Sequence, residues 1–143
     1  MTIQRGRRIA FDYGDARIGV AISDPDAILA SPLVTLKTLD KKLKFTISEL
    51  FKAYEPITIY VGRPSNMDGT TGLAREKSSA FAAILATLTS VPIIEIDERL
   101  STVSASRSLR ESGVNAKAAK NRIDEAAAVA ILEFALSIEK NRQ

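Results

Sequence analysis

The chain has 143 residues, of which 45% are hydrophobic and 26% are charged, and its formal net charge is +3. This length and balance predict a single domain over residues 1–143 with a buried core, and they exclude a chain that is disordered throughout. Cysteine and histidine are both absent, which excludes disulfides, thiolate nucleophiles, Ser-His-Asp triads and imidazole metal ligands.

The N-terminal residues are basic and lead directly into a strand-like segment, without the apolar stretch of a signal peptide. No apolar run in the sequence is long enough to span a bilayer. The sequence therefore predicts a soluble, cytoplasmic protein.

Hydrophobic periodicity predicts three strands and a helix in the first part of the chain. Residues 8–13 and 17–23 have the pattern of two strands joined by a short turn, and residues 31–36 that of a third. Apolar residues at helical spacing then predict an amphipathic helix over residues 40–54.

The rest of the chain alternates strands with helices. A strand over 57–61 is followed by a loop rich in Gly and Pro, a helix over 73–88 and a strand over 92–97. Ser101 or Thr102 can cap a third helix that Gly113 would end, and an alanine-rich apolar stripe predicts a last helix from about residue 123. The order β-β-β-α-β-α-β-α-α predicts an α/β fold, in which a mixed five-stranded sheet is flanked by helices.

Acidic residues stand at the ends of these predicted elements. Asp12 ends the first strand, Asp97 and Glu98 end the fifth, and Asp124 opens the last helix. Ligands of α/β sheets collect at strand ends, so we expect Asp12 beside Glu98 if their strands are parallel neighbours, with Asp124 closing the cluster. Clustered carboxylates favour a bound cation, and Mg²⁺ or Mn²⁺ prefers oxygen ligands. Paired ions of this kind hydrolyse phosphodiesters without histidine or cysteine.

Each acid also has a purely structural interpretation. Asp12 precedes a Tyr-Gly turn, Asp97 and Glu98 suit the N-terminal dipole of a helix, and Asp124 can pair at the surface with Lys120 or Arg122. The segment from Asp12 to Gly19 is also similar to the phosphate loop of actin- and hexokinase-like ATP-binding folds. Those kinases need two such lobes, and this chain has room for one.

Basic residues gather in the last third of the chain, where a polyanion would be attracted. Between residues 99 and 122 they are Arg99, Arg107, Arg110, Lys117, Lys120 and Arg122, against the single acid Glu111. A solvated helix face explains this charge equally well. The loop at 62–69 offers Arg63, Asn66 and backbone N–H groups to a phosphate backbone, and a rigid Pro/Gly connection explains it equally well.

Four blocks of sequence resemble, in the same order, those of the YqgF/RuvX family. They are residues 11–24 (FDYGDARIGVAISD), 61–69 (VGRPSNMDG), 97–102 (DERLST) and 123–128 (IDEAAA). The resemblance implies an RNase H-like fold related to the RuvC resolvases. It also implies a nuclease that processes the 5′ end of pre-16S rRNA during ribosome maturation, or else a Holliday junction resolvase.

The resemblance also implies roles for particular residues. Asp12, Glu98 and Asp124 are similar to the catalytic acids that hold Mg²⁺ or Mn²⁺, with Asp97 as the neighbouring alternative. Arg17, Asn66 and Arg99 match positions suited to substrate contact, and Lys117, Lys120 and Arg122 are expected to steer the phosphate backbone.

These assignments predict a metal-dependent nuclease that acts on pre-rRNA, with the pre-ribosomal particle as a further partner and a monomer or homodimer as its state. The alternatives are a resolvase that cuts branched DNA with the same acids, a non-catalytic RNA-binding factor, and a nucleotide-binding module. Dependence of cleavage on Mg²⁺ or Mn²⁺ separates the pre-rRNA nuclease and the resolvase from a factor that only binds RNA.

Overall fold

The computed structural model describes residues 4–63, 72–97 and 116–141, with side chains except at 72–75 and 116–123. The predicted third helix, after Ser101 or Thr102, lies outside these ranges. Within them, no helix is long and apolar enough to cross a membrane.

A single mixed sheet organises the described residues. The elements follow in the order β1 (Arg8–Tyr13), β2 (Arg17–Ser23), β3 (Ala30–Lys37), α1 (Leu43–Tyr54), β4 (Thr58–Arg63), α2 (Gly72–Leu88), β5 (Ile93–Asp97) and α4 (Ala116–Asn141). The strand order is β3-β2-β1-β4-β5. Strands β1 to β3 form an antiparallel meander, while β4 is parallel to β1 and β5 is parallel to β4. The predicted α/β fold with a mixed five-stranded sheet is confirmed.

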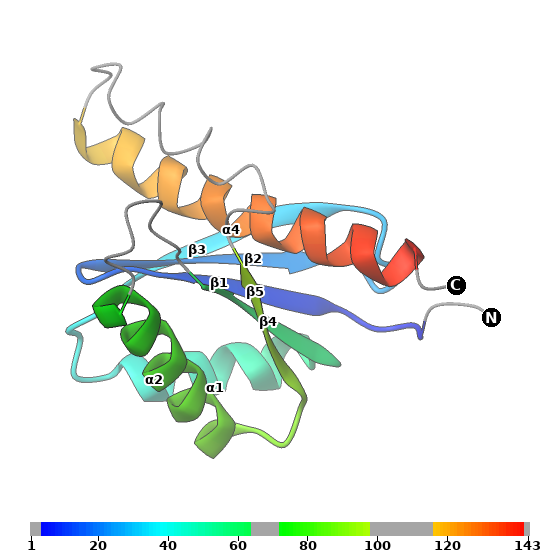
Figure 1. Cartoon of the computed structure of the whole chain (residues 1–143), viewed down its shortest axis with the longest axis horizontal. Coiled ribbons are helices and arrows are strands. Elements are labelled where there is room, and N and C mark those ends of the chain that lie inside the picture. The colour runs from blue at the N-terminus through cyan, green and yellow to red at the C-terminus, as the bar shows by residue number, and fades with distance from the viewer. Residues whose placement is uncertain (1–3, 64–71, 98–115, 142–143) are drawn as a thin grey trace.

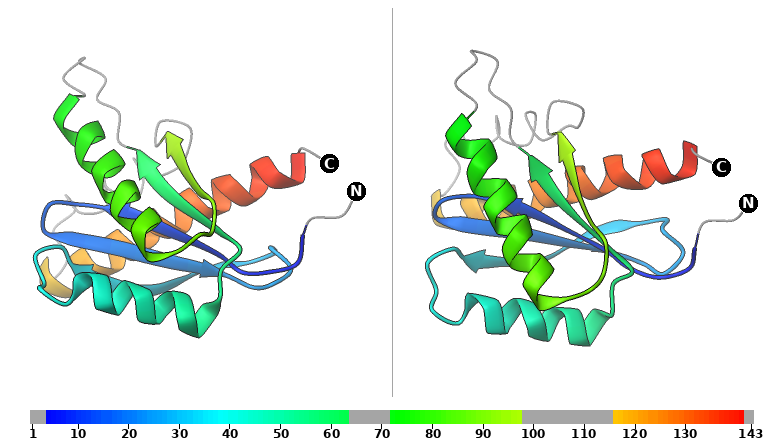
Figure 2. Two further views of the ribbon diagram at one scale, coloured as in Figure 1. Left: turned by 90° about the horizontal axis from the view of Figure 1, so that it is seen from below. Right: turned by 60° about the horizontal axis from the view of Figure 1, so that its bottom comes forward.

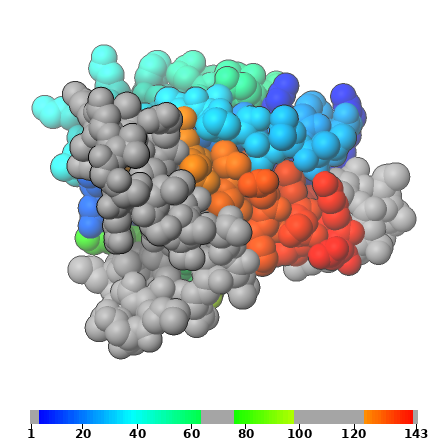
Figure 3. All heavy atoms as spheres, turned by 90° about the horizontal axis from the view of Figure 1, so that it is seen from above, coloured from blue at the N-terminus to red at the C-terminus, as the bar shows by residue number. Residues whose placement is uncertain are grey.

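Helices cover both faces of this sheet. Helix α4 crosses one face, and helices α1 and α2 cover the other (Figures 1 and 2). Seen from its own side, α4 lies alongside the blue and cyan strands of the meander (Figure 3). The alternation of side chains along β1 decides which residues meet which helix, because successive residues of a strand point to opposite faces. Ile9 and Phe11 pack towards α1 and α2, and Ala10 packs towards α4.

The two apolar layers differ in the size of their residues. On the α1 and α2 side, the Phe11 ring stands edge-on to Phe51 and Phe81, with centroids 6.2 and 5.5 Å apart. The layer under α4 is rich in alanine, for example Ala127 and Ala135, which leaves little side-chain volume between helix and sheet. Helix α4 therefore lies close to the strands, as its small-residue stripe predicts.

Two predicted helix starts differ from the structure by three residues or more. Helix α1 begins at Leu43 and not at residue 40, because the carboxylate of Asp40 accepts the backbone N–H of Lys42 at 2.9 Å and holds a turn before the helix. Helix α4 begins at Ala116, so Asp124 lies inside the helix and does not open it.

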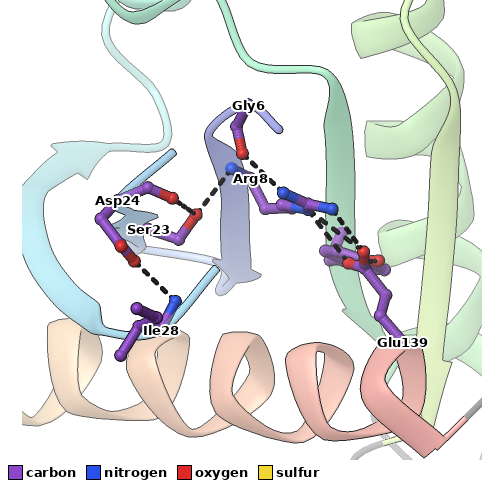
Figure 4. A network of polar contacts seen from close by, with 7 residues as sticks. Gly6, Arg8, Ser23, Asp24, Ile28 and Glu139 are labelled. Carbon is purple, nitrogen blue, oxygen red and sulfur yellow. Dashed lines mark hydrogen bonds and ion pairs between the residues drawn. The ribbon is translucent and has the colours of Figure 1, made fainter. Parts of the chain in front are cut away.

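A buried polar network joins the first residue of β1 to the C-terminal end of α4. The side chain of Arg8, whose residue is 1% exposed, donates to Glu139 Oε1 through Nη2 at 2.7 Å and to the carbonyl of Gly6 through Nη1 at 2.6 Å (Figure 4). The Tyr60 hydroxyl donates to Glu139 Oε2 at 2.5 Å. A charge can be buried in this way only when it is paired and hydrogen-bonded.

The loop that follows β2 is held by Asp24 in the same region (Figure 4). Its Oδ1 accepts the backbone N–H groups of Ile28 at 2.7 Å and Leu29 at 2.8 Å. These hydrogen bonds, that from Leu29 first, lower the pKa of the Asp24 carboxyl, because they favour its charged form. The Asp24 carboxylate therefore serves as the hydrogen-bond acceptor for two backbone N–H groups of this loop.

Replacing Glu139 with Leu is expected to lower the free energy of unfolding by about 3 kcal/mol, because Arg8 is left buried without its carboxylate. Urea unfolding followed by circular dichroism measures the loss. The double variant Arg8→Met/Glu139→Leu is the control and should recover most of the stability, since it leaves no unpaired charge. Equal losses in the single and double variants would contradict this account.

Candidate functional site

Asp12 lies near the carboxyl end of β1 and faces helix α4. Arg8, Ala10 and Asp12 are alternate residues of β1, so their side chains point to the same face of the sheet. Arg8 bonds to Glu139 of α4, and Ala10 packs under that helix. Asp12 is 6% exposed and is paired in register with Gly19 of β2. Its interpretation as a turn former is therefore wrong, because the residue is inside a central strand.

Gly19 brings the backbone of α4 against the sheet beside Asp12. A Cβ atom on Gly19 would lie 2.0 Å from the carbonyl oxygen and 2.4 Å from the carbonyl carbon of Asp124. Because directly paired residues of antiparallel strands have Cα atoms about 5 Å apart, Asp12 and Asp124 meet in the same small region. Gly19 is thus required for the approach of a helix and leaves no room there for the phosphate of the actin-like alternative.

A partly buried ion pair occupies part of this region. The Arg17 guanidinium donates through Nε to Asp124 Oδ2 at 2.6 Å, with the Asp124 side chain 9% exposed and that of Arg17 28% exposed. The interpretation of Asp124 as a surface residue is therefore wrong. Sequence reasoning assigned Arg17 to substrate contact and missed this partner, which lies 107 residues away.

The next residue of α4 reaches the neighbouring strand. Thr35 of β3 donates its hydroxyl to Glu125 Oε2 at 2.8 Å, and Thr35 is the register partner of Gly19. Asp12, Gly19 and Thr35 therefore form one row across three strands under the same turn of α4. No sequence signal singled out Thr35, because its role depends on strand register.

Asp12 is expected beside Glu98 if their strands are parallel neighbours, and this condition is not met, because β4 separates β1 from β5. On the α4 face the strand between them presents Gly62, two residues beyond Tyr60, which packs under α4. Glycine has no side chain, so at the level of Asp12 the strand β4 places no side chain between Asp12 and β5 on that face.

Asp97 faces the other side of the sheet. Ile96 packs in the layer under α4, whereas Glu95 accepts a hydrogen bond from Ser79 of α2 at 3.1 Å. Alternation therefore directs Asp97 with Glu95 towards α2, away from Asp12 and Asp124. Asp97 is thereby disfavoured as the partner of those two acids.

The other residues named from the sequence are only partly covered. Glu98, Asn66 and Arg99 lie outside the described residues. Lys117, Lys120 and Arg122 lie on α4, but their side chains are not among those described. Within the described side chains, no group of three or more acidic residues is close enough to hold a metal ion. The described part of the site thus supplies two buried carboxylates and one guanidinium.

The sequence matches a known family over almost its whole length. The model of the RuvX family, described as Holliday junction resolvase, matches residues 6–138. The chain belongs to the RuvX family. The recognition of this family from four blocks of sequence is confirmed.

Curated RuvX relatives share much of this sequence. A protein of Streptomyces avermitilis is 46% identical over 142 residues, which cover 98% of this chain and 91% of the relative. A protein of Cutibacterium acnes is 42% identical over 132 residues, covering 92% of this chain and 82% of the relative. Both carry the name "Putative pre-16S rRNA nuclease". The prediction of a nuclease agrees with these names and with the description of the family.

Solved structures of low sequence identity share the fold of this RuvX chain. RuvC of Thermus thermophilus in complex with a Holliday junction substrate superposes with a TM-score of 0.63 at 14% identity, covering 94% of this chain and 96% of RuvC. RuvC from the same organism in another structure gives 0.59. This likeness confirms the predicted RNase H-like fold.

Proposed function

We propose that this RuvX protein is a metal-dependent nuclease of the cytoplasm that hydrolyses RNA phosphodiesters, with the 5′ end of pre-16S rRNA as its substrate. The observation that carries the proposal is the pair of buried carboxylates, Asp12 and Asp124, brought together where α4 touches β2 through Gly19. The names of the curated relatives support the choice of substrate.

The donor set fits Mg²⁺ or Mn²⁺. Buried carboxylates require a positive partner, and at Asp124 the Arg17 guanidinium occupies that position at 2.6 Å. In the proposal, Asp12 and Asp124 hold the ion together with Glu98. When bound, such an ion activates a water and stabilises the leaving oxygen of a phosphodiester. Glu98 is preferred to Asp97 because Asp97 follows Ile96 on β5 and faces α2.

In this proposal, the basic residues bind the phosphate backbone of the RNA substrate. Arg17 lies beside Asp124, and its guanidinium suits a phosphate oxygen once an ion neutralises the acid. Asn66, Arg99, Lys117, Lys120 and Arg122 are proposed to contact the same strand. The binding energy of such contacts falls with salt concentration, because bound counterions are released.

The test is cleavage of a labelled pre-16S rRNA 5′ leader by the whole protein with Mn²⁺ and with EDTA. Cleavage at the mature 5′ end with Mn²⁺ alone is the expected result. A four-way DNA junction is assayed in parallel, because the description of the family and the RuvC fold favour a resolvase as the second candidate. Cleavage of the junction but not of the leader would establish the resolvase, and metal-independent binding without cleavage of either would establish a binding factor.

Arg17 is expected to compete with the metal ion for Asp124. The variant Arg17→Met should bind Mn²⁺ roughly tenfold more tightly, because it removes a positive charge from the carboxylate. Titration followed by the electron paramagnetic resonance of free Mn²⁺ measures this without any substrate. Arg17→Lys keeps the charge and is the matched control, expected to bind Mn²⁺ like the wild type. Weaker binding in Arg17→Met would instead show that the guanidinium holds Asp124 in position.

A further inference from the structure

The connection between β3 and α1 carries a cluster of lysines around two exposed apolar side chains. Leu39 is 88% exposed and Phe45 is 64% exposed, among the highest values for large apolar residues of the described chain. All four surrounding lysines are exposed. We name this cluster the lysine patch, and its members are Lys37, Leu39, Lys41, Lys42, Lys44 and Phe45.

The patch carries a net positive charge. In the described part of the chain, none of its four lysines forms an ion pair with an acid. Asp40 is the one acid within the segment, so its charge offsets one of the four lysines, and its Oδ1 accepts the backbone N–H of Lys42 at 2.9 Å. A polyanion that approaches this surface therefore meets free ammonium groups.

The lysines at the start of α1 do not stabilise this helix. Lys42 occupies the N-cap position of α1 without a side-chain cap, and no acidic residue lies in the first helical turn. Positive charges near a helix N-terminus oppose the helix dipole, so Lys41, Lys42 and Lys44 destabilise α1 slightly. Phe45 lies on the side of α1 opposite the buried Ile47 and Phe51, so its ring adds nothing to the core. A surface that breaks local rules in this way is typical of a functional site.

The patch lies at the same edge of the sheet as the candidate active site. Strands β1 and β3 are both antiparallel to β2, so they end at the same edge. Thr38 donates its backbone N–H to Ala16 O at 3.1 Å and its hydroxyl to Gly14 O at 2.7 Å, which fixes the segment to the β1–β2 turn. Figures 1 and 2 show this connection beside that turn.

Arg17 links the two regions directly. It contacts Asp124 in the site, and it is the register partner of Lys37, the last residue of β3. Arg17 and Lys37 therefore stand side by side at this edge on the α4 face, and the rest of the lysine patch lies where the chain turns from Lys37 to α1 on the other face. A strand of nucleic acid that leaves the site past Arg17 and Lys37 would pass over this edge of the sheet to reach the rest of the lysine patch.

We propose that the lysine patch binds the single-stranded RNA that flanks the cleavage site. Its ammonium groups contact successive phosphates, and the exposed Phe45 ring stacks on a base. A positively charged path with an aromatic platform is the usual means of binding single strands without sequence preference. This inference rests on the proposed function, because it assigns the flanking part of that RNA substrate.

The test measures binding of the labelled pre-16S rRNA 5′ leader by fluorescence anisotropy, with EDTA present so that no cleavage occurs. The variant Lys41→Gln/Lys44→Gln is expected to bind about tenfold more weakly, and its salt dependence should fall by about 1.4 in the slope of log K against log salt, for two lost phosphate contacts. Phe45→Ala is expected to bind roughly tenfold more weakly with an unchanged slope, because stacking releases no counterions.

The matched control is Arg5→Gln/Lys140→Gln, which removes the same charge from exposed residues at the other end of the sheet. It should keep the affinity of the wild type within about twofold, since distant exposed charges are screened by salt. Equal losses in the patch variant and the control would overturn the proposal. So would conversion of a wild-type dimer to a monomer by Phe45→Ala in sedimentation velocity, which would assign the surface to a second copy of this chain.

The outcome separates this inference from the proposed function. Cleavage of the leader by the wild type, together with unchanged RNA binding by the patch variants, would overturn RNA binding by the lysine patch and support the proposed nuclease activity. Lost RNA binding in the patch variants, with no cleavage by the wild type under any divalent ion, would support the patch and overturn the nuclease.

Discussion

Replacing Asp12 with Asn is expected to lower the rate of Mn²⁺-dependent RNA cleavage on the order of a thousandfold, equivalent to about 4 kcal/mol of barrier. Asp12 is 6% exposed on β1, opposite Gly19 and under the turn of α4 that carries Asp124. Asparagine has nearly the same shape, so the strand and its packing should remain. It lacks the negative charge that a divalent ion requires of its ligands.

The measurement is single-turnover cleavage of the labelled leader over a range of Mn²⁺ concentrations. RNA binding in EDTA and the thermal midpoint show that the variant is folded. Asp97→Asn is the matched control, because this second acid of similar chemistry lies on β5 and faces α2. It should cleave at close to the wild-type rate. Full activity in Asp12→Asn, or equal loss in both variants, would contradict the assignment of the site to the α4 face.

Replacing Gly19 with Ala is expected to lower the free energy of unfolding by about 3 kcal/mol, at the upper end of the range for adding a methyl group to a packed core. The added Cβ would lie 2.0 Å from Asp124 O and 3.1 Å from the backbone nitrogen of Glu125. These are backbone atoms, which cannot rotate away, so α4 must move from the sheet. The same movement separates Asp124 from Asp12, and cleavage should fall with stability.

Urea unfolding measures the stability of this variant, and hydrogen exchange along α4 locates the change. Thr35→Ala is the control, because it removes the hydroxyl that donates to Glu125 without adding any atom. That loss should cost about 1 kcal/mol. A Gly19→Ala protein as stable as the wild type would show that α4 has room to adjust.

Local periodicity was enough to predict most elements of this protein. Strands β1 to β5 and helices α1 and α2 lie within a few residues of their predicted positions, because apolar spacing reports the faces of a strand or helix directly. The absence of cysteine and histidine restricted the chemistry to carboxylates and basic groups. The four blocks of sequence were sufficient to recognise the RuvX family, which the family match confirms.

The tertiary structure alone decided how these elements form a site. Periodicity does not encode strand order, so only the fold placed β4 between β1 and β5 and directed Asp97 away from Asp12. The start of α4 at Ala116, well before Asp124, was likewise not visible in a stripe of small residues. Contacts between distant residues depend on packing. The pairing of Arg17 with Asp124, of Arg8 with Glu139, and of Gly19 with the backbone of α4 arises because the alanine layer lets that helix lie against the sheet.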